Sequence, residues 1–514
     1  MRRILALTSI TISIAACVIH RLEVTPVDTN VTEPTVVVSP VKVHLLDGST
    51  VVFPNGVSVD RGAVRGDGRR YDLTLGDGTS VSEVPTDRIA AIESYQTPVS
   101  TGASAAATAG SSIAWIVGGT ALAVAIFGSC PTVYSMDERG PILEAELFSY
   151  SIAPSFQSRD VDRLGLTTAP GGRIDLEVRN EMLETHYIDR LELLEVLHAP
   201  NEEAYPDEIG TPLVVSDVLE PSSAIDQSGR DVWETIRAAD SVAWSTPKER
   251  LASVDADDFT DHVDLEFDVP ALQPRGKDVA LVLRMRNSLL STVLLYDVML
   301  KGQGYGALDW MGADLDRFRN WLELGLWYRG NMGMNVSVWR NGRYRVVKHI
   351  GDLGPIAWSE RAITLPAPAR NGKLKVRLSF PSDNWRIDRV GLALASRSAE
   401  VRAVPASRAT TPEGDRADIP AFLDESNRQY LITKPSDSVR LGFDVGEPPA
   451  GKARTWFLAS EGYYMEWMRA DWLTSQPVER FEPTTRSLTR ALALYSDKRA
   501  DMRRQFESTK IPIR

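Results

Sequence analysis

Residues 41–59 read VKVHLLDGSTVVFPNGVSV, a run in which short apolar stretches alternate with turn signals. Val41, Val43 and Leu45 alternate with polar residues before Asp47-Gly48, a dipeptide that favours a tight hairpin. Similar apolar runs and glycine-containing turns continue to residue 96. About five or six short strands of this kind predict a small SH3-like or Sm-like barrel over residues 41–96. A barrel of this shape hosts many functions, so it implies no activity.

The same alternation of apolar and polar residues returns after residue 130 and predicts a mainly β, multidomain chain. The expected strands lie near residues 173–178, 191–197, 263–269, 279–285, 334–338, 374–380 and 387–392. Gly, Pro and Ser between these runs favour β-sandwich-like folds. We expect one sandwich-like domain at 130–300 and a second, with a helix, at 301–404. Residues 405–514 are expected to hold a linker, a β segment and a final helix.

Two segments have the spacing of amphipathic helices, in which apolar residues recur every three or four positions. The first predicts a helix over residues 308–322, with the apolar positions Leu308, Met311, Leu315, Phe318 and Leu322. The second predicts a C-terminal helix that begins after Pro483. Its apolar positions are Leu488, Leu492, Tyr495, Met502 and Phe506.

The N-terminus has the pattern of an export signal. Arg2 and Arg3 precede a mostly apolar run over residues 4–14, and the small pair Ala15-Ala16 stands before Cys17. This arrangement resembles a bacterial lipoprotein signal peptide. The resemblance implies that residues 1–16 are removed and that Cys17 becomes the acylated first residue.

The lipid implied at Cys17 would anchor the chain to a membrane of the bacterial cell envelope. Val18 stands at the second mature position, where Asp in many such proteins implies retention in the inner membrane, so the outer membrane is favoured. Residues 17–40 are rich in Pro, Thr and Val and are expected to form an extended tether. The chain has two cysteines, and acylation of Cys17 would leave Cys130 without a disulfide partner.

Residues 100–129 combine a small-residue linker with a hydrophobic helix. Residues 113–127 contain no charge, and as a helix they would span about 22 Å, which is marginal for crossing a membrane. Two interpretations stay open: a membrane-embedded helix, or a helix sequestered within the protein or an oligomer. Gly118-Gly119 and the pair Ala121 and Ala125 permit close helix packing, so several copies could associate through this segment.

A Ser-Cys-Pro-x-x-Tyr segment at residues 129–134 follows the hydrophobic helix, and an Asn-Glu-x-x-Glu-Thr-x-Tyr strand spans residues 180–187. Together they resemble a group of large, β-rich, uncharacterised bacterial lipoproteins. The resemblance covers roughly residues 128–240 and implies a shared architecture without an assigned reaction.

The charge balance excludes nucleic acid as an expected partner. The chain carries 57 Lys and Arg against 69 Asp and Glu, a net charge of −12 that becomes −14 without Arg2 and Arg3. A phosphate backbone requires a basic face, and here the basic residues are interleaved with acidic ones.

Sequence motifs of common hydrolases are missing. The chain has no Gly-x-Ser-x-Gly elbow, no His-Glu-x-x-His helix and no Cys-x-x-Cys pair. Its six histidines are all more than four residues apart, so their spacing does not predict a zinc site. No cofactor is therefore expected from these motifs.

An acidic stretch offers the best metal candidate. Asp255, Asp257, Asp258 and Asp261 lie within seven residues and could supply the oxygen ligands that calcium prefers. The alternative is a solvated loop and strand, because the acidic residues that follow at 264, 266 and 268 alternate with apolar ones, as on the wet face of a strand.

Aromatic residues in the C-terminal half are candidates for ligand binding. Sugars or peptides could stack on exposed members of this set. The set comprises Trp339, Trp358, Trp385, Tyr463, Tyr464 and Trp467. Packing of these rings in the cores of the sandwiches is the alternative.

The sequence thus favours a non-catalytic lipoprotein of the cell envelope, acting as a binding or assembly module for another protein or an envelope polysaccharide. The alternative is a secreted glycan-acting hydrolase that uses carboxylate catalysis. Its carboxylate pair would be defined by separation in space and cannot be recognised from spacing along the chain.

Overall fold

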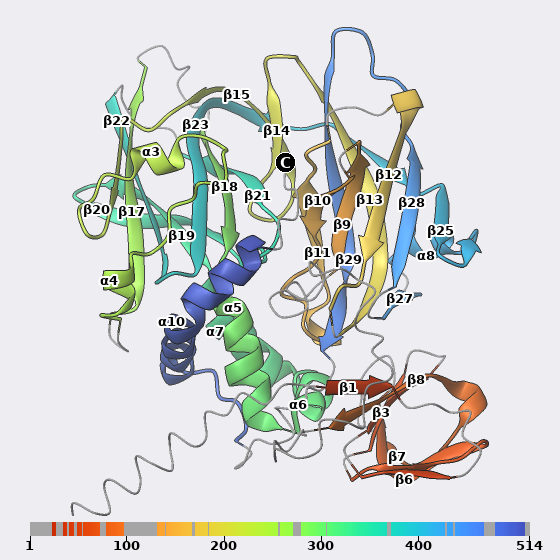
Figure 1. Cartoon of the computed structure of the whole chain (residues 1–514). Helices are drawn as coiled ribbons and strands as arrows, with labels where there is room; N and C mark the ends of the chain where they lie inside the picture. The colour runs from red at the N-terminus through yellow and green to blue at the C-terminus, as the bar shows by residue number, and fades with distance from the viewer. Residues whose placement is uncertain are drawn as a thin grey trace, which may run out of the picture. The chain divides into compact units, whose positions relative to one another are not determined.

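The computed structural model describes residues 23–26, 34–38, 41–45, 49–53, 55–71, 79–96, 131–138, 140–166, 170–182, 184–254, 258–270, 279–304, 306–366, 372–426, 429–434, 437–466 and 479–508. The chain is mainly β and multidomain, as predicted (Figure 1). It forms two compact units. The N-terminal unit comprises residues 1–116, 300–313 and 468–480, and the large unit comprises 117–299, 314–467 and 481–514. Cys17 and residues 113–127 lie outside the described residues.

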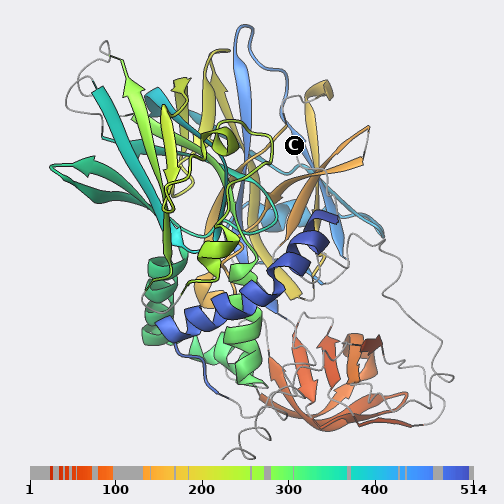
Figure 2. The same cartoon turned by 60° about the vertical axis from the view of Figure 1, so that its left-hand side comes forward.

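The N-terminal unit is a curled sheet in the form of a half-barrel (Figure 2). Its strands are β1 (Glu23–Pro26), β2 (Thr35–Val37), β3 (Val41–Leu45), β4 (Thr50–Phe53), β5 (Val57–Val59), β6 (Ala63–Tyr71), β7 (Thr79–Pro85) and β8 (Ile89–Gln96). They pair in the order β1-β8-β3-β4-β6-β5-β2, with β7 on β6. Val41, Val43, Val51 and Phe53 lie in its core because alternate residues of a strand point to the same face.

The first sandwich of the large unit consists of two antiparallel sheets. One has the order β10-β9-β12-β28-β25-β26, and the other β11-β29-β13-β24, with β27 on β13. The bounds are β9 (Thr132–Asp137), β10 (Gly140–Glu146), β11 (Ser158–Arg163), β12 (Arg173–Arg179), β13 (Glu184–His198), β24 (Val401–Pro405), β25 (Arg408–Thr411), β26 (Gly414–Asp415), β27 (Leu431–Thr433), β28 (Ser438–Asp444) and β29 (Ala453–Glu466). Leu176, Ile188, Phe443 and Trp456 pack in its core.

The second sandwich is inserted between β13 and β24 of the first. Its sheets have the orders β14-β15-β23-β18-β21 and β16-β17-β22-β19-β20. The bounds are β14 (Glu203–Pro206), β15 (Pro212–Leu219), β16 (Ser223–Asp226), β17 (Thr260–Val269), β18 (Val279–Asn287), β19 (Met334–Arg340), β20 (Arg343–Ile350), β21 (Ser359–Leu365), β22 (Gly372–Pro381) and β23 (Trp385–Ser398). Alternate residues such as Leu265, Leu281, Val336 and Leu378 fill its core.

This topology differs from the expected domain division. Strands on both sides of residue 300 share the two sheets of the second sandwich, since β18 pairs with β21 and β23, and β17 pairs with β22. The segment around residues 405–420, expected to be a linker, contributes β25, which pairs with β28. Local sequence patterns do not reveal such long-range pairing, because each strand has the same alternation wherever its partner lies.

The described helices of the large unit are short apart from two. They are α3 (Trp233–Ile236), α4 (Lys248–Leu251), α5 (Leu290–Val293), α7 (Phe318–Met332), α8 (Ile419–Leu423) and α10 (Thr485–Ser508), and α5 continues as a π-helix over Leu294–Leu300. The helix α10 confirms the expected amphipathic C-terminal helix, with Leu488, Leu492 and Tyr495 buried. In the part of the chain that the structure describes, no helix has the length and apolar character that crossing a membrane requires.

The helix expected over residues 308–322 is wrong as a continuous element. The chain forms α6 (Gly306–Asp309) and a π-helical turn (Trp310–Asp314), then breaks before α7. At the break Arg317 is extended, with φ −74° and ψ 119°, and its guanidinium lies 3.3 Å from a carboxylate oxygen of Asp314. Leu308, Met311 and Leu315 are buried, whereas Phe318 and Leu322 on α7 are exposed.

The two sandwiches pack against each other through the sheet that contains β11, β13 and β29. Val161, Leu194 and Phe457 from that sheet form one apolar cluster with Ala204 and Val214 of β14 and β15. A second cluster joins Tyr134, Leu143 and Met182 to Ile356 and Ala357 in the loop after β20. These contacts hold β9, β10 and β11 beside the second sandwich.

Candidate functional site

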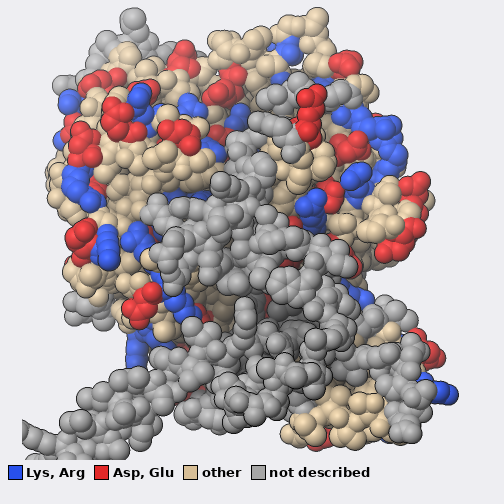
Figure 3. Space-filling view, in the orientation of Figure 1, with Lys and Arg blue, Asp and Glu red and all other residues tan. Residues whose placement is uncertain are grey.

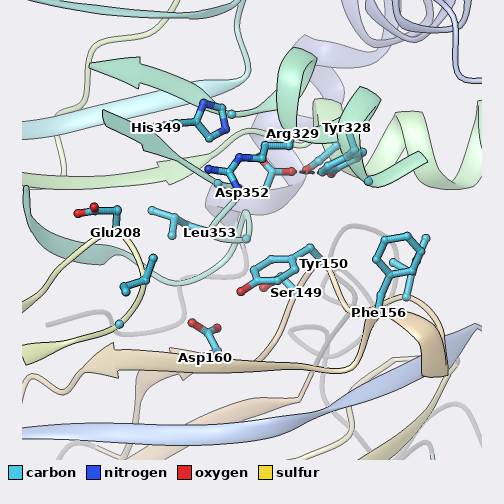
Figure 4. Close-up of a pocket in the computed structure, with 18 of the residues that line it drawn as sticks. Ser149, Tyr150, Phe156, Asp160, Glu208, Tyr328, Arg329, His349, Asp352 and Leu353 are labelled. Carbon is cyan, nitrogen blue, oxygen red and sulfur yellow. Dashed lines mark hydrogen bonds between the residues drawn. The ribbon is translucent and has the colours of Figure 1, made fainter. Parts of the chain in front are cut away.

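A cavity of about 690 Å³ lies within the large unit, where the two sandwiches meet helix α7 (Figure 4). Residues 149–161 of the first sandwich line one side, and residues 347–355 of the second line the other. The π-helix after α5 and the helix α7 close a third side. This volume falls in the range of roughly 300–1,000 Å³ that is typical of small-molecule sites.

One wall of the cavity is apolar. Leu295 and Met299 of the π-helix, Leu324 of α7, and Ile152 and Phe156 of the β10–β11 connection contribute to it. Phe156 of this connection contacts Trp321 of α7, with 6.3 Å between the ring centroids. This wall would remove apolar ligand surface from water.

Gly325 leaves this wall open. A Cβ atom built on Gly325 would meet only the Phe156 ring, at 3.7 Å, which is an ordinary van der Waals distance. The position therefore has room for a Cβ, and because Gly325 lines the cavity, a larger side chain here would take up cavity volume. Gly325 thus offers a way to fill the cavity by substitution.

The partly buried Tyr328 of α7 and the buried Asp352 form a hydrogen-bonded pair that also lines the cavity (Figure 4). The Tyr328 hydroxyl donates to Asp352 Oδ2 at 2.5 Å, and Asn384 Nδ2 donates to Oδ1 at 3.4 Å. Burial is the main cause that raises the pKa of Asp352 from 3.8 to about 6, while these hydrogen bonds oppose the rise. Burial and the neighbouring carboxylate raise the pKa of Tyr328 well above its usual value.

His349 lies on the same side of the cavity as Asp352. Its Nδ1 is 3.0 Å from Asn335 Oδ1, and its Nε2 has no partner in the described part of the chain. Burial, followed by the charge of Arg329, lowers the pKa of His349, so the imidazole is neutral at pH 7. The ring packs directly on Gly333, where a Cβ would lie 2.4 Å from Nε2.

The facing side is built around Arg361 of β21 and two aspartates of β11. Arg361 Nη1 donates to the carbonyl oxygen of Val161 at 2.7 Å, and Nη2 lies 3.6 Å from Asp160 and 3.5 Å from Asp162. Asp160 also accepts backbone N–H groups of Phe148 at 3.1 Å and Val161 at 2.8 Å. Burial, with the nearby Asp160, raises the pKa of Asp162 well above its usual value.

The lining carboxylates have partners within the protein, whereas two lining arginines have none among the described residues. Glu208 pairs with Lys348, and Asp160 and Asp352 have the partners described above. Arg159 of β11 and Arg329 of α7 line the cavity but form no ion pair or hydrogen bond with any described residue. Both are exposed, so they lie where the cavity meets solvent.

Three of the aromatic residues proposed from the sequence as ligand-binding are buried, and one of these three lines the cavity. Trp385, Tyr463 and Tyr464 have at most 1 % of their surface exposed. Tyr464 lines the cavity, and its hydroxyl donates to the Ser149 carbonyl oxygen at 2.9 Å. Tyr463 stacks on Tyr187 with 4.6 Å between ring centroids. Trp467 lies outside the described residues.

Trp358 and Trp339 lie elsewhere in the second sandwich. Trp358 is half-buried, with the guanidinium groups of Arg284 and Arg286 within 5 Å of its ring centroid. Trp339 is 45 % exposed and contacts Tyr344 edge-on, at a centroid distance of 5.0 Å. The structure therefore does not gather the aromatic set into one site.

The acidic residues proposed as calcium ligands surround an arginine where they are described. Arg250 lies 2.8 Å from Asp258 and 2.9 Å from Asp261. Asp261 also accepts hydrogen bonds from Thr246 at 2.5 Å and Ser382 at 2.9 Å. Asp255 and Asp257 lie outside the described residues. Among residues that are described, no group of three or more His, Cys, Asp or Glu side chains is placed to hold a metal ion.

Apart from Tyr464, the cavity residues could not be predicted from the sequence, because they come from seven separated segments without a shared motif. One local signal is present: Gly325 and Gly330 lie in α7 and Gly333 directly follows it, although glycine is unfavourable within a helix. Comparison with protein-family models, with curated proteins and with solved structures finds no match. Function must therefore be inferred from the residues themselves.

Proposed function

We propose that this chain is a non-catalytic binding module of the bacterial cell envelope, anchored by lipid at Cys17, and that its ligand occupies the cavity beside α7. The cavity of about 690 Å³ is the observation that carries the proposal. An apolar wall provides contact area, and a few polar groups fix orientation, which is the usual composition of a small-molecule site. The N-terminal signal pattern supports the location.

The geometry favours binding over catalysis. The lining carboxylates are held by Arg361, Lys348 and Tyr328, so their charges already serve the fold. The cavity accepts a compact molecule or the end of a chain, including the end of an envelope polysaccharide. A folded protein partner would instead contact the outer surface, where acidic and basic groups are intermixed on the face shown in Figure 3.

The test is to fill the cavity and ask whether a ligand is lost. The full chain is produced in a Gram-negative host as wild type, Gly325→Phe and Gly330→Phe, and molecules released by denaturation are identified by mass spectrometry. Gly330 lies on the same helix, and a Cβ there would meet nothing within 4 Å, so it is the matched control. We expect one compound near equimolar amount in the wild type and in Gly330→Phe, and its depletion in Gly325→Phe. Equal recovery from all three chains would contradict the proposal.

A second candidate function, glycan hydrolysis, is favoured by Asp352 alone. A carboxyl with a pKa of about 6 can act as a general acid near neutral pH. Both of its oxygens hold hydrogen bonds to Tyr328 and Asn384, which weakens this candidate. Release of reducing ends from cell-wall glycan by the wild type, abolished in Asp352→Asn, would establish hydrolysis; no release at any pH from 4 to 8 would exclude it.

A further inference from the structure

We propose that the cavity ligand is an anionic amphiphile, with an apolar chain along the α7 wall and an anionic head beside Arg159 and Arg329. This inference rests on the proposed function and names the ligand class of the same site. Fatty carboxylates and lipid phosphates share this chemistry.

The apolar wall favours a ligand with an alkyl chain. Leu295, Met299 and Leu324 are at most 7 % exposed where they line the cavity, and Phe156 faces them from the β10–β11 connection. A ligand made only of hydroxyl groups would have to lose water from those groups without gaining partners along this wall. An alkyl chain loses no hydrogen bonds there, and its burial is favourable in proportion to the apolar surface that it removes from water.

The positive charges that remain available at the cavity favour a ligand with an anionic head. Asp160, Glu208 and Asp352 are engaged with groups of the protein, as are Arg361 and Lys348. Among the described lining residues, the ionised side chains without such a partner are Arg159 and Arg329. Both can turn towards a head group, since both are exposed. Guanidinium groups bind carboxylate and phosphate oxygens with paired hydrogen bonds.

The two arginines are attached to different elements of the large unit. Arg159 belongs to β11 of the first sandwich, and Arg329 to α7 beside the second. Both line the cavity, and Figure 4 shows Arg329 on the side of the cavity that faces Tyr150 and Asp160. An anion held between them would make contacts with both elements. A cationic head at this place would instead be repelled by the two guanidinium groups.

The experiment compares probes that share one chain and differ in the head group. The full chain is kept in solution by an amphipathic polymer without detergent, and binding is measured by native mass spectrometry. The probes are dodecanoate, dodecyl phosphate, dodecanol and dodecyltrimethylammonium, and maltose is the polar control without an alkyl chain. Binding that is present in the wild type and lost in Gly325→Phe is counted as cavity binding. Comparing the two chains corrects for probe molecules that bind non-specifically to the apolar N-terminal segments, because both chains contain these segments.

We expect cavity binding for dodecanoate or dodecyl phosphate, at least tenfold tighter than for dodecanol, and none for dodecyltrimethylammonium or maltose. The double variant Arg159→Gln/Arg329→Gln should lose at least tenfold in affinity for the anionic probe while its affinity for dodecanol is unchanged. Arg343→Gln, an exposed arginine of β20 outside the cavity lining, is the control. The ratio of dodecanoate to dodecyl phosphate affinity separates a fatty-acid source from a lipid-phosphate source.

Two outcomes overturn the ligand class separately from the function. Cavity binding of maltose or of the trimethylammonium probe would retain the cavity as a site and reject an anionic amphiphile. Absence of cavity binding by every probe, together with equal recovery of molecules from the wild type and Gly325→Phe, would reject both proposals.

Discussion

Arg361 of β21 donates a hydrogen bond to the carbonyl oxygen of Val161 on β11, at 2.7 Å, across the boundary between the two sandwiches. The Arg361 side chain is only 5 % exposed, and the carboxylates of Asp160 and Asp162 lie within 3.6 Å of its Nη2. One buried cation therefore joins the inserted sandwich to the first and forms part of the cavity lining.

Replacing Arg361 with Met should loosen this boundary. The substitution keeps an apolar stem but leaves Asp160 and Asp162 without their cation, and an unpaired buried charge typically costs about 3–5 kcal/mol. We expect a lower melting temperature and faster amide exchange in β11 and β21. Arg345→Met, at an exposed position of β20, is the control and should behave as the wild type. Equal behaviour of the two variants would show that Arg361 does not stabilise the boundary.

The pKa of Asp352 predicts a dependence of stability on pH. The pKa rises from 3.8 to about 6 on folding, mainly because the carboxyl is buried. A raised pKa means that the folded state holds the proton more tightly, so this group adds stability that is complete below pH 3.8 and is lost as pH rises through about 6. Asp352→Asn removes this contribution, and its free energy of unfolding should fall by less than that of the wild type between pH 4 and 7.

The expected difference between Asp352→Asn and the wild type over that range is up to about 3 kcal/mol, from a shift of about two pKa units. Urea unfolding of both chains at several pH values measures it. Asp297→Asn, at an aspartate of the π-helix that pairs with Lys498, is a control for a general charge effect. Parallel curves for the wild type and Asp352→Asn would mean that Asp352 titrates normally.

Gly333→Ala should destabilise the cavity side that contains His349. The added Cβ would lie 2.4 Å from His349 Nε2 and 2.7 Å from the carbonyl oxygen of Ile350, so the backbone as well as the ring would have to move. Overpacking of this kind typically costs about 1–3 kcal/mol. Gly330→Ala adds the same atom in open space and should be neutral or stabilising by up to about 1 kcal/mol. Thermal unfolding compares them, and equal melting temperatures would refute the predicted clash.

The signal pattern predicts lipid at Cys17. Cells that produce the full chain are grown with radiolabelled palmitate, and the chain is isolated by an affinity tag. We expect label on the wild type and on Cys130→Ser, and none on Cys17→Ala. Label that persists in Cys17→Ala would show that the N-terminus is processed in another way.

The mainly β class could be predicted because alternating residues such as Val41, Val43 and Leu45 reveal a strand directly. Which strands pair with one another is harder to predict from the sequence. The paired strands β13 and β24, for example, are separated by an insertion of about two hundred residues. The helix expected at 308–322 is interrupted because Leu308 and Phe318 keep a helical spacing across a break at Arg317, whose backbone is extended.

The candidate site could not be predicted from sequence. Residue type gave Trp385 and Trp339 equal standing, yet one is fully buried and the other is 45 % exposed. The aspartates proposed for calcium are close in sequence. In the fold, however, Asp258 and Asp261 both form ion pairs with Arg250, and sequence spacing does not predict these contacts. Arg159 and Arg329 lie 170 residues apart, and only the packing of the sandwiches places both at one cavity.

The most direct test of the cavity as a ligand site is photo-crosslinking with a dodecanoate that carries a diazirine near the end of its chain. After irradiation of the full chain, labelled residues are mapped by peptide mass spectrometry, with excess unlabelled dodecanoate as competitor. We expect competed labelling in residues 291–299 and 318–332, lost in Gly325→Phe and kept in Gly330→Phe. Competed labelling that is confined to other segments, or that survives in Gly325→Phe, would contradict this expectation.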